Sequence, residues 1–558
     1  MKKRFLYIVA LLLVTVLLSG CALLPLVAKL RTETHGVVEV EPELDLEGGD
    51  WVIDKAAEGG LAYNAAMMPM PSEAEAGAWL PAYEPDFNTE EYASIDENGF
   101  HSVRTSPLST FSADVDTASY CNLRRMLNDG YLPSEIPSGA VRVEEMLNYF
   151  RYGYEAPKDG ERFGVTAQIG ECPWNPEAKL LMLGIRAADA PEAVAEGSNL
   201  VFLVDVSGSM EDTNKLDLVK KALVMLTDAL TDQDTVSICT YSDGEEILIE
   251  GANPVKDRAK LIATIESLWA RGYTDGQRGL AQAYEVAGRY YRPHGNNRVI
   301  MCSDGDLNVG ITSESDLHDF VSEKRETGVY LSVLGFGDGN YKDTKMETLA
   351  DDGNGNYYYI DSILEARKVL VEELTQTLYA VADDVKFQIE FNPAKISAWR
   401  QVGYENRALA DEDFENDQKD AGEVGAGGTV TVLYELLPAG GEAEDGGLKY
   451  QTGTLTEASQ GDEWLTLSMR YKEPGGEKSQ LQTRAIGEAD IAETPSEDFR
   501  FASAVAEFGM LLGKSDFIGG IGYSDILDLL KQTSLDDDYK EELFSLVKIA
   551  QRAERLAD

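Results

Sequence analysis

The sequence predicts an α/β protein whose central region, residues 196–381, folds as a doubly wound, mostly parallel six-stranded sheet of Rossmann-like type. Apolar runs alternate there with stretches of helical period, a pattern typical of a parallel sheet with helices on both faces. The apolar run Asn199–Val204 is typical of a strand buried on both faces. Asp205-Val206-Ser207-Gly208-Ser209 follows at once, at the strand end where open α/β sheets bind ligands.

The elements of this region can be placed in order along the chain. Six strands are predicted, the third of them at a sheet edge: Asn199–Val206, Thr235–Tyr241, Glu246–Glu250, Arg298–Cys302, Tyr330–Phe336 and Asn356–Ile360. Six helices accompany them: Lys215–Leu230, Val255–Leu268, Gly279–Tyr291, Glu314–Thr327, Asp343–Ala350 and Leu364–Ala380. Apolar residues of the first helix form one stripe, which predicts the face that packs on the sheet: Val219, Ala222, Leu223, Leu226 and Leu230.

Changes in pattern predict three further regions: an N-terminal α+β segment (105–195), a β-sandwich of short strands (382–495) and a C-terminal helical region (496–558). Asp114 and Asp116 form a D-x-D pair, for which a capping or turn role is favoured over a metal site. The acidic loop 411–417 does not match an EF-hand, because Asn416 and Gly422 stand where Gly and Glu are required.

The N-terminal residues carry the features of an export signal. A basic start and the apolar run Phe5–Leu18, short for a bilayer span of about 20 residues, predict a signal peptide over residues 1–20. Leu18-Ser19-Gly20-Cys21 resembles the bacterial lipobox, which implies that Cys21 is lipidated and anchors the chain to the cell membrane or the outer membrane, outside the cytoplasm. A plain signal peptide with an incidental cysteine is the alternative. Residues 21–104, rich in Glu, Ala, Gly and Pro, predict an acidic flexible tether.

Composition excludes some partners. The chain has 558 residues and a net charge of −49, which disfavours nucleic acid and anionic lipid because phosphates would be repelled. Cys239 and Cys302 fall inside predicted core strands and are expected to be buried thiols, whereas the sequence leaves open whether Cys121 and Cys172 form a disulfide. The four histidines are scattered and no C-x-x-C occurs, so no zinc site is predicted.

Hydroxyl and carboxylate side chains gather after the first and fourth predicted strands and in a glycine-flanked loop between them: Asp205, Ser207, Ser209, Thr274 and Asp304. Oxygen ligands of this kind suit Mg²⁺ or Mn²⁺. The order D-x-S-x-S, Thr, Asp-Gly resembles the metal-ion-dependent adhesion site of von Willebrand factor type A domains. That resemblance implies direct metal binding by the three hydroxyls and mostly water-mediated contacts from the two carboxylates. A metal held with so little negative charge favours a carboxylate from outside.

The resemblance extends beyond the metal motif. The succession of signal, tether, N-terminal segment, A-type domain and C-terminal β and helical regions is similar to that of a family of bacterial von Willebrand factor type A domain lipoproteins. Five stretches carry the similarity: residues 109–120, 199–210, 296–310, 331–341 and 403–427. One position departs from the family, which often has a small residue before the loop threonine, where this chain has Tyr273. Its ring could narrow access to the metal or stack on a ligand.

These features lead to one main functional hypothesis and an alternative. The main hypothesis is a surface-exposed, lipid-anchored binding or adhesion protein that holds Mg²⁺ and uses it to bind an Asp or Glu of a partner protein. The alternative is a structural subunit of a cell-envelope complex, in which the metal serves the fold. A metal-dependent hydrolase is not expected, because hydrolysis needs a base beside an activated water and no histidine occurs in the metal motifs.

Overall fold

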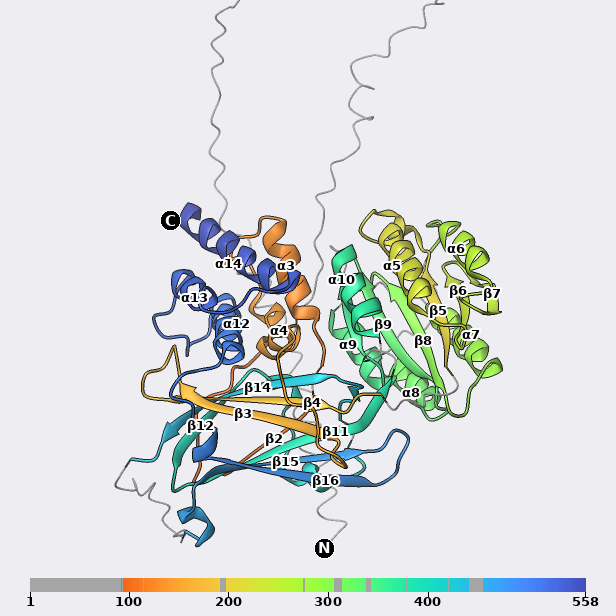
Figure 1. Cartoon of the computed structure of the whole chain (residues 1–558). Coiled ribbons are helices and arrows are strands. Elements are labelled where there is room, and N and C mark those ends of the chain that lie inside the picture. Colours follow the sequence, from red (N-terminus) through yellow and green to blue (C-terminus); the bar gives the residue numbers. More distant parts are fainter. Residues whose placement is uncertain are drawn as a thin grey trace, which may run out of the picture. The chain divides into compact units, whose positions relative to one another are not determined.

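In the computed structural model of the chain, six apolar strands form the sheet expected between residues 196 and 381 (Figure 1). Their order is β10-β9-β8-β5-β6-β7. Their bounds are β5 Ser198–Asp205, β6 Thr235–Tyr241, β7 Glu245–Ala252, β8 Asn296–Ser303, β9 Tyr330–Phe336 and β10 Tyr357–Ile360. All neighbouring strands are parallel except β6 and β7. The predicted fold class is therefore confirmed, with β7 as the antiparallel edge strand.

The structure describes residues 92, 94–113, 115–190, 197–273, 276–305, 314–337, 343–374, 376, 379–419, 421–440 and 455–557, all within one unit, Glu84–Asp558. The predicted signal peptide, most of the tether, and the residues Cys21, Asp114 and Thr274 lie outside the described residues. Residues 441–454 of the predicted β-sandwich region also lie outside them. Over the described ranges, each helix is either too short or too polar to span a bilayer.

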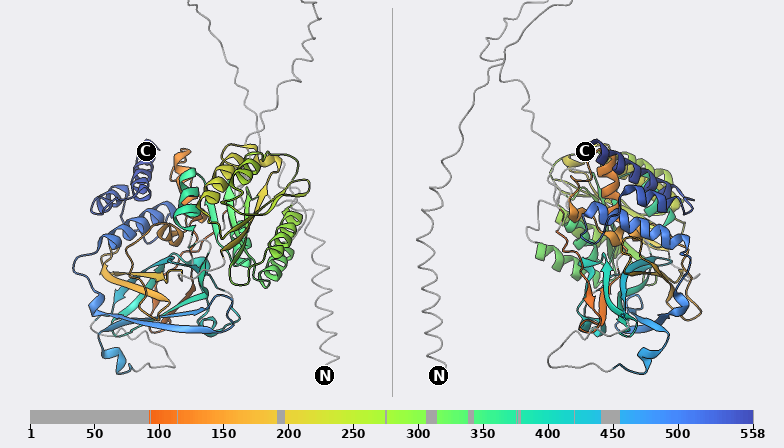
Figure 2. Two further views of the ribbon diagram at one scale, coloured as in Figure 1. Left: turned by 45° about the vertical axis from the view of Figure 1, so that its right-hand side comes forward. Right: turned by 90° about the vertical axis from the view of Figure 1, so that its left-hand side faces the viewer.

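Helices cover both faces of the six-stranded sheet, as the views in Figure 2 show. They are α5 Leu216–Ala229, α6 Arg258–Glu266, α7 Gly276–Arg289, α8 Glu314–Arg325, α9 Asp343–Asp352 and α10 Ile363–Arg367. Side chains of β5 alternate between the two faces. Phe202 and Val204 pack with the predicted stripe of α5, whereas Val201 and Leu203 pack with α7. The last predicted helix, Leu364–Ala380, ends earlier than expected. Its α-helical part is followed by a π-helical turn, η5 Lys368–Glu372, and Ala380 already belongs to a strand.

Residues that precede the central domain in the sequence and residues that follow it form one β-sandwich together. One sheet has the order β1-β12-β14-β4-β3 and the other β13-β11-β15-β16, with β2 paired to β11. The strands are β1 His101–Ser102, β2 Leu108–Ser112, β3 Phe163–Glu171, β4 Lys179–Ala187, β11 Ala380–Phe391, β12 Ile396–Val402, β13 Val424–Gly425, β14 Thr429–Pro438, β15 Glu463–Lys472 and β16 Ser479–Gly487. One apolar core lies between the sheets.

Two sequence-based boundaries differ from this arrangement. Residues 105–195 and 382–495 were predicted as separate domains. In the structure β4 pairs with β14, and β2 pairs with β11. The two stretches therefore fold together. The predicted tether reaches too far, because its last residues join the sandwich. β1 pairs with β12, the ring of His101 stacks on Trp399 at 4.7 Å, and Val103 is buried.

The remaining helices pack into a core of their own. These are α3 Ala118–Asn128, α4 Val143–Asn148, α12 Glu497–Gly513, α13 Tyr523–Leu530 and α14 Asp538–Ala557. Apolar residues at helical spacing in the predicted C-terminal helical region are buried there: Phe501, Val505, Phe508, Leu512, Leu543, Leu546, Val547 and Ala550.

Two arginines, the buried Arg124 and the partly buried Arg407, tie these parts to the central domain. Arg124 of α3 donates to Asp361, to Glu365 of α10 and to the hydroxyl of Tyr149, and also to Glu542 of α14. Its side chain is 2% exposed, so burial strengthens every one of these contacts.

Arg407 makes the second tie. It donates to Asp116 Oδ2 at 2.9 Å and to Glu347 of α9 at 3.0 Å. Asp116 also accepts from the backbone N–H of Tyr357. Of the capping or turn role predicted for the D-x-D pair, capping of α3 by Asp116 is not observed, because the N-cap is Thr117, which makes no side-chain capping bond. The carboxylate of Asp116 takes part in an ion pair instead.

Replacing Arg124 by leucine should destabilise the fold by about 3–5 kcal/mol, because removal of one partner leaves buried carboxylates uncompensated. Urea unfolding followed by tryptophan fluorescence measures the change. Arg258→Leu is the matched control, since its pair with Asp228 is about half-exposed and exposed pairs contribute little to stability. Equal effects of the two substitutions would contradict a central role for Arg124.

Candidate metal centre

Asp205 is the last residue of β5 and lies at the carboxyl edge of the sheet. The pairing of β5 with β8 sets Val204 opposite Cys302, so the residues that follow both strands meet at this edge. Asp205 is fully buried. Its Oδ1 accepts the backbone N–H of Ser207 at 2.8 Å, and its Oδ2 accepts the hydroxyl of Ser303 at 3.3 Å. The carboxylate is thus held from both strand ends.

The two serine hydroxyls of the D-x-S-x-S motif point toward each other. After Asp205 the chain turns into a short 3₁₀ helix, η4 Gly208–Glu211, with Ser207 preceding it. The Oγ atoms of Ser207 and Ser209 are 3.1 Å apart. Adjacent ligands of an octahedral Mg²⁺ with bonds of about 2.0–2.1 Å are separated by about 2.9 Å. The spacing of this hydroxyl pair therefore fits a Mg²⁺-sized cation.

Asp304 follows β8 and completes the cluster from the other side. It is 2% exposed, and its Oδ2 accepts the Nζ of Lys215 at 3.0 Å. Lys215 precedes α5 and also donates to the carbonyl oxygen of Ser209 at 2.9 Å. Lys215 was not among the site residues predicted from the sequence.

The loop that carries the predicted threonine is fastened to the D-x-S-x-S turn. The N–H of Arg271 donates to the carbonyl of Val206 at 2.6 Å, and the N–H of Gly208 donates to the carbonyl of Gly272 at 3.0 Å. Gly272 has φ +72°, and an added Cβ would clash with Asp243, so glycine is required at this position. Thr274 lies outside the described residues, two positions beyond this anchored glycine.

Two like charges meet in this cluster. Burial, together with the nearby carboxylate of Asp304, raises the pKa of Asp205 to about 7, although the hydrogen bonds from Ser207 oppose the rise. A cation between the two carboxylates would relieve both costs. The donors that the structure brings together, two hydroxyls 3.1 Å apart and two buried carboxylates, thus have the chemistry of a Mg²⁺ or Mn²⁺ site.

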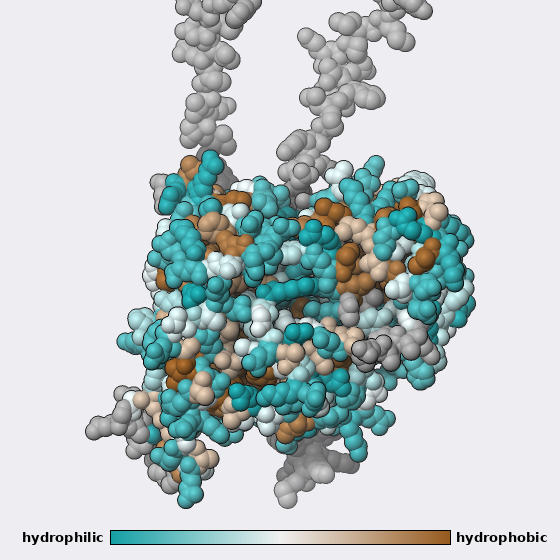
Figure 3. Space-filling model, viewed as in Figure 1, coloured by the Kyte–Doolittle hydropathy of each residue, from teal (hydrophilic) through white to brown (hydrophobic). Residues whose placement is uncertain are grey.

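Aromatic side chains lie exposed beside the metal motif. Trp269 is 59% exposed and Tyr273 is 82% exposed, and both belong to the loop that is bonded to the D-x-S-x-S turn. The guanidinium of Arg271 lies 4.9 Å from the centre of the Trp269 ring. Trp and Tyr are residue types enriched at protein–protein interfaces. The face of the molecule drawn in Figure 3 is otherwise mostly hydrophilic.

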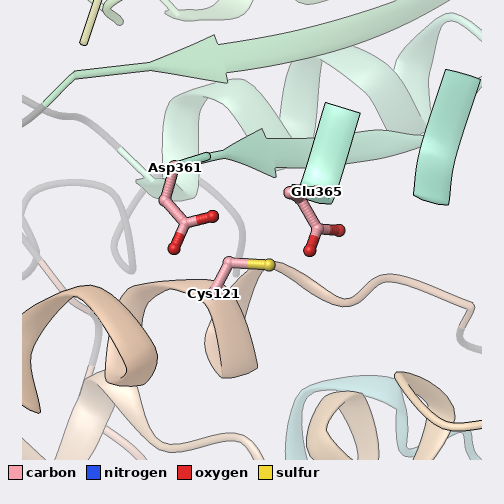
Figure 4. Close-up of side chains that lie close together, drawn as sticks. All are labelled: Cys121, Asp361 and Glu365. Atoms are coloured by element: carbon pink, nitrogen blue, oxygen red, sulfur yellow. The ribbon is translucent and has the colours of Figure 1, made fainter. Parts of the chain in front are cut away.

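A second acidic cluster lies between α3 and α10 and does not suit a metal. Cys121, Asp361 and Glu365 converge there (Figure 4). Arg124 bonds both carboxylates and so already supplies their counter-charge. Burial raises the pKa of the Cys121 thiol well above its usual value, and Glu365 adds to the rise, so the thiolate that would bind a metal is disfavoured.

The four cysteines that the structure describes are free thiols. Cys121, Cys172, Cys239 and Cys302 are all buried and unpaired, which answers the open question about the first two. The expectation of buried thiols for Cys239 and Cys302 is confirmed, on β6 and β8 on either side of β5.

Comparison with known proteins agrees with the fold of the central domain. Residues 199–373 match the von Willebrand factor type A domain, residues 86–182 match a family described as von Willebrand factor, and residues 376–553 match the family described as uncharacterized protein YfbK, C-terminal. The fold and the matched domain define a protein with a von Willebrand factor type A domain, a type that typically mediates protein–protein interaction.

One relative spans most of the chain. The uncharacterized protein YfbK of Escherichia coli (strain K12) is 40% identical over 473 residues, which cover 83% of this chain and 81% of YfbK. The chain therefore belongs to the YfbK-like family of von Willebrand factor type A domain proteins. More distant relatives share less of it. Inter-alpha-trypsin inhibitor heavy chain H3 of Homo sapiens is 26% identical over 174 residues, covering 29% of this chain and 19% of that protein.

A solved structure, von Willebrand factor type A from Catenulispora acidiphila, is 17% identical with a TM-score of 0.39 and covers 72% of this chain and 91% of its own.

Proposed function

We propose that the protein is a membrane-anchored, extracytoplasmic binding protein whose A-type domain holds Mg²⁺, or Mn²⁺, and uses it to bind an Asp or Glu of a partner protein. The observation that carries the proposal is the hydroxyl pair of Ser207 and Ser209 beside the buried carboxylates of Asp205 and Asp304. Thr274 is proposed as the fifth ligand on the resemblance of its motif alone.

The residues of this chain fit the chemistry of such a site. Ser207 and Ser209 would hold the metal through neutral oxygens, and the two carboxylates supply the negative charge behind them. When bound, the metal supplies a Lewis-acidic position for an external carboxylate. Asp205 is held by the N–H of Ser207 and the hydroxyl of Ser303, which keeps the cluster preorganised and lowers the cost of ordering it on binding.

The exposed aromatic residues support a protein as the partner. Trp269 and Tyr273 stand on the loop that is bonded to the metal motif, so a protein whose acidic residue reached the metal would also cover these rings. Tyr and Trp are among the residues that contribute most binding energy in protein interfaces. No catalytic step is part of the proposal, and metal-stimulated hydrolysis of an ester or peptide would contradict it.

Calorimetric titration of Mg²⁺ and Mn²⁺ into the detergent-solubilised full chain tests the metal site. We expect saturable binding at one site, and at least about a tenfold loss of affinity in Asp205→Asn, because the substitution removes a buried negative charge beside the cation. Asp217→Asn, on the exposed first turn of α5, is the control and should bind like the parent. Unchanged binding in Asp205→Asn would place the metal elsewhere.

Capture of partners from a cell-envelope fraction, with Mg²⁺ or with EDTA, tests the binding mode. A partner held through the metal should not be captured in EDTA or by Asp205→Asn. Its affinity should fall about tenfold or more when Trp269→Ala and Tyr273→Ala are combined. Tyr291→Ala is the control, an exposed aromatic outside the loop of Trp269 and Tyr273. Capture that survives both EDTA and Asp205→Asn would favour the alternative, a structural subunit that docks by other surfaces.

The membrane anchor is tested by Cys21→Ser. Metabolic labelling with an alkyne fatty acid should mark the parent and not the variant, and the variant should move from the membrane fraction to the soluble fraction, since stable attachment depends on the buried acyl chains. Cys172→Ser, which keeps the cysteine of the lipobox, should be labelled like the parent. Labelling that persists in Cys21→Ser would rule out this anchor.

A further inference from the structure

Lys215 places a positive charge inside the candidate metal centre. Its Nζ donates to Asp304 Oδ2 at 3.0 Å and to the carbonyl oxygen of Ser209 at 2.9 Å. The side chains of Lys215 and Asp304 are 7% and 2% exposed. The ammonium therefore touches a carboxylate and a backbone oxygen that both belong to the metal motifs, in a place from which water is largely excluded.

The position of this lysine is built into the fold. Lys215 precedes the first turn of α5, where the helix dipole disfavours a positive charge. Its stem passes Gly337, directly after β9, which has φ +81°. A Cβ at this glycine would clash with the Cγ, Cδ and Cε atoms of Lys215. The carbonyl of Gly337 is in turn held by the hydroxyl of Tyr359 at 2.5 Å. Gly337 thus leaves the space that the lysine stem needs to reach Asp304.

We propose that Lys215 is the resident counter-cation of Asp304, which neutralises this carboxylate in the metal-free site and lowers the affinity of the site for divalent metal. This inference rests on the proposed function of the cluster as a metal centre. With both carboxylates ionised, Asp205 and Asp304 contribute two negative charges and Lys215 one positive charge, so the set carries one negative charge. A divalent ion then leaves one positive charge in excess, whereas without Lys215 the loaded set would be neutral.

Two consequences follow from this charge balance. The ammonium repels an incoming cation at short range in a buried site, where charges interact several times more strongly than in water. The excess positive charge of the loaded site attracts an external carboxylate. Lys215 is therefore a positioning residue that weakens metal binding alone and leaves the loaded site selective for an anionic group.

Titration of Mg²⁺ alone into the full-length protein and its Lys215→Met variant tests the inference. Methionine keeps the length of the stem and removes the charge, so we expect the variant to bind Mg²⁺ about tenfold more tightly or better. In EDTA the variant should melt at a lower temperature than the parent, because the ammonium on Asp304 is gone, and Mg²⁺ should raise its Tm more than that of the parent. A merely structural role for Lys215 would lower the Mg²⁺ affinity instead.

Lys220→Met is the matched control, since it removes the same charge from the helix that follows Lys215, at a residue paired with Asp217, and it should leave Mg²⁺ binding unchanged. Should Lys215→Met not fold, Lys215→Gln keeps a hydrogen-bond donor without the charge and carries the same expectation. Binding in the parent that is as tight as in the Lys215 variant, or tighter, would overturn this inference and leave the metal centre standing. Absence of Mg²⁺ binding in both proteins would overturn the metal centre and the inference together.

Discussion

The parallel pairing of β5 with β8 is the constraint on which the candidate site depends. Because Val204 lies opposite Cys302, the polar residues that follow the two strands emerge side by side, and two carboxylates become buried at one edge of the sheet. A one-residue shift in this register would turn the side chains of one strand to the other face and separate Asp205 from Ser303. The cores on the two faces of β5 oppose such a shift, since Phe202 and Leu203 fill opposite cores.

The other parts of the chain are joined to the central domain by ion pairs that are buried at Arg124 and partly buried at Arg407. The segment 109–120, one of the stretches that carry the family resemblance, supplies β2 to the sandwich and Asp116 to Arg407. The helix that begins in this segment brings Arg124 to the end of the central domain. A buried ion pair contributes little net stability over an apolar contact, but loss of one partner is costly. We therefore interpret these ion pairs as interactions that fix how the sandwich and the helices pack on the central domain.

Much of this could be predicted from the sequence, and the failures have physical reasons. Period and apolar runs predicted the central sheet, its edge strand and the stripe of α5, because burial on one or two faces leaves a local pattern. The shared sandwich could not be predicted in this way, since the pairing of β4 with β14 joins residues far apart in the chain. For the same reason Asp116 was assigned a local capping role, although its partner, Arg407, is remote in sequence.

The sequence likewise predicted some residues of the candidate site and missed another. Asp205, Ser207, Ser209 and Asp304 carry a motif, and the structure brings these four to one edge of the sheet. Their binding of a metal stays a prediction. Lys215 carries no motif. One local signal could have marked it, a lysine at the start of a helix where the dipole disfavours it. A residue that tolerates such a position generally has a compensating partner, and here that partner is Asp304, which only the tertiary structure reveals.

The charge of the whole chain sets a limit on how a partner can be recognised. A net charge of −49 repels an acidic partner at long range, and salt screens that repulsion beyond about 10 Å. Long-range steering therefore cannot bring an acidic protein to the metal centre. The proposed attraction must therefore arise at short range. One source would be the metal, whose charge the carboxylates would not fully neutralise because Lys215 is already paired with one of them. The other source would be the exposed rings of Trp269 and Tyr273. Recognition of this kind is selective, since an acidic surface without a matching apolar neighbour would meet mainly repulsion.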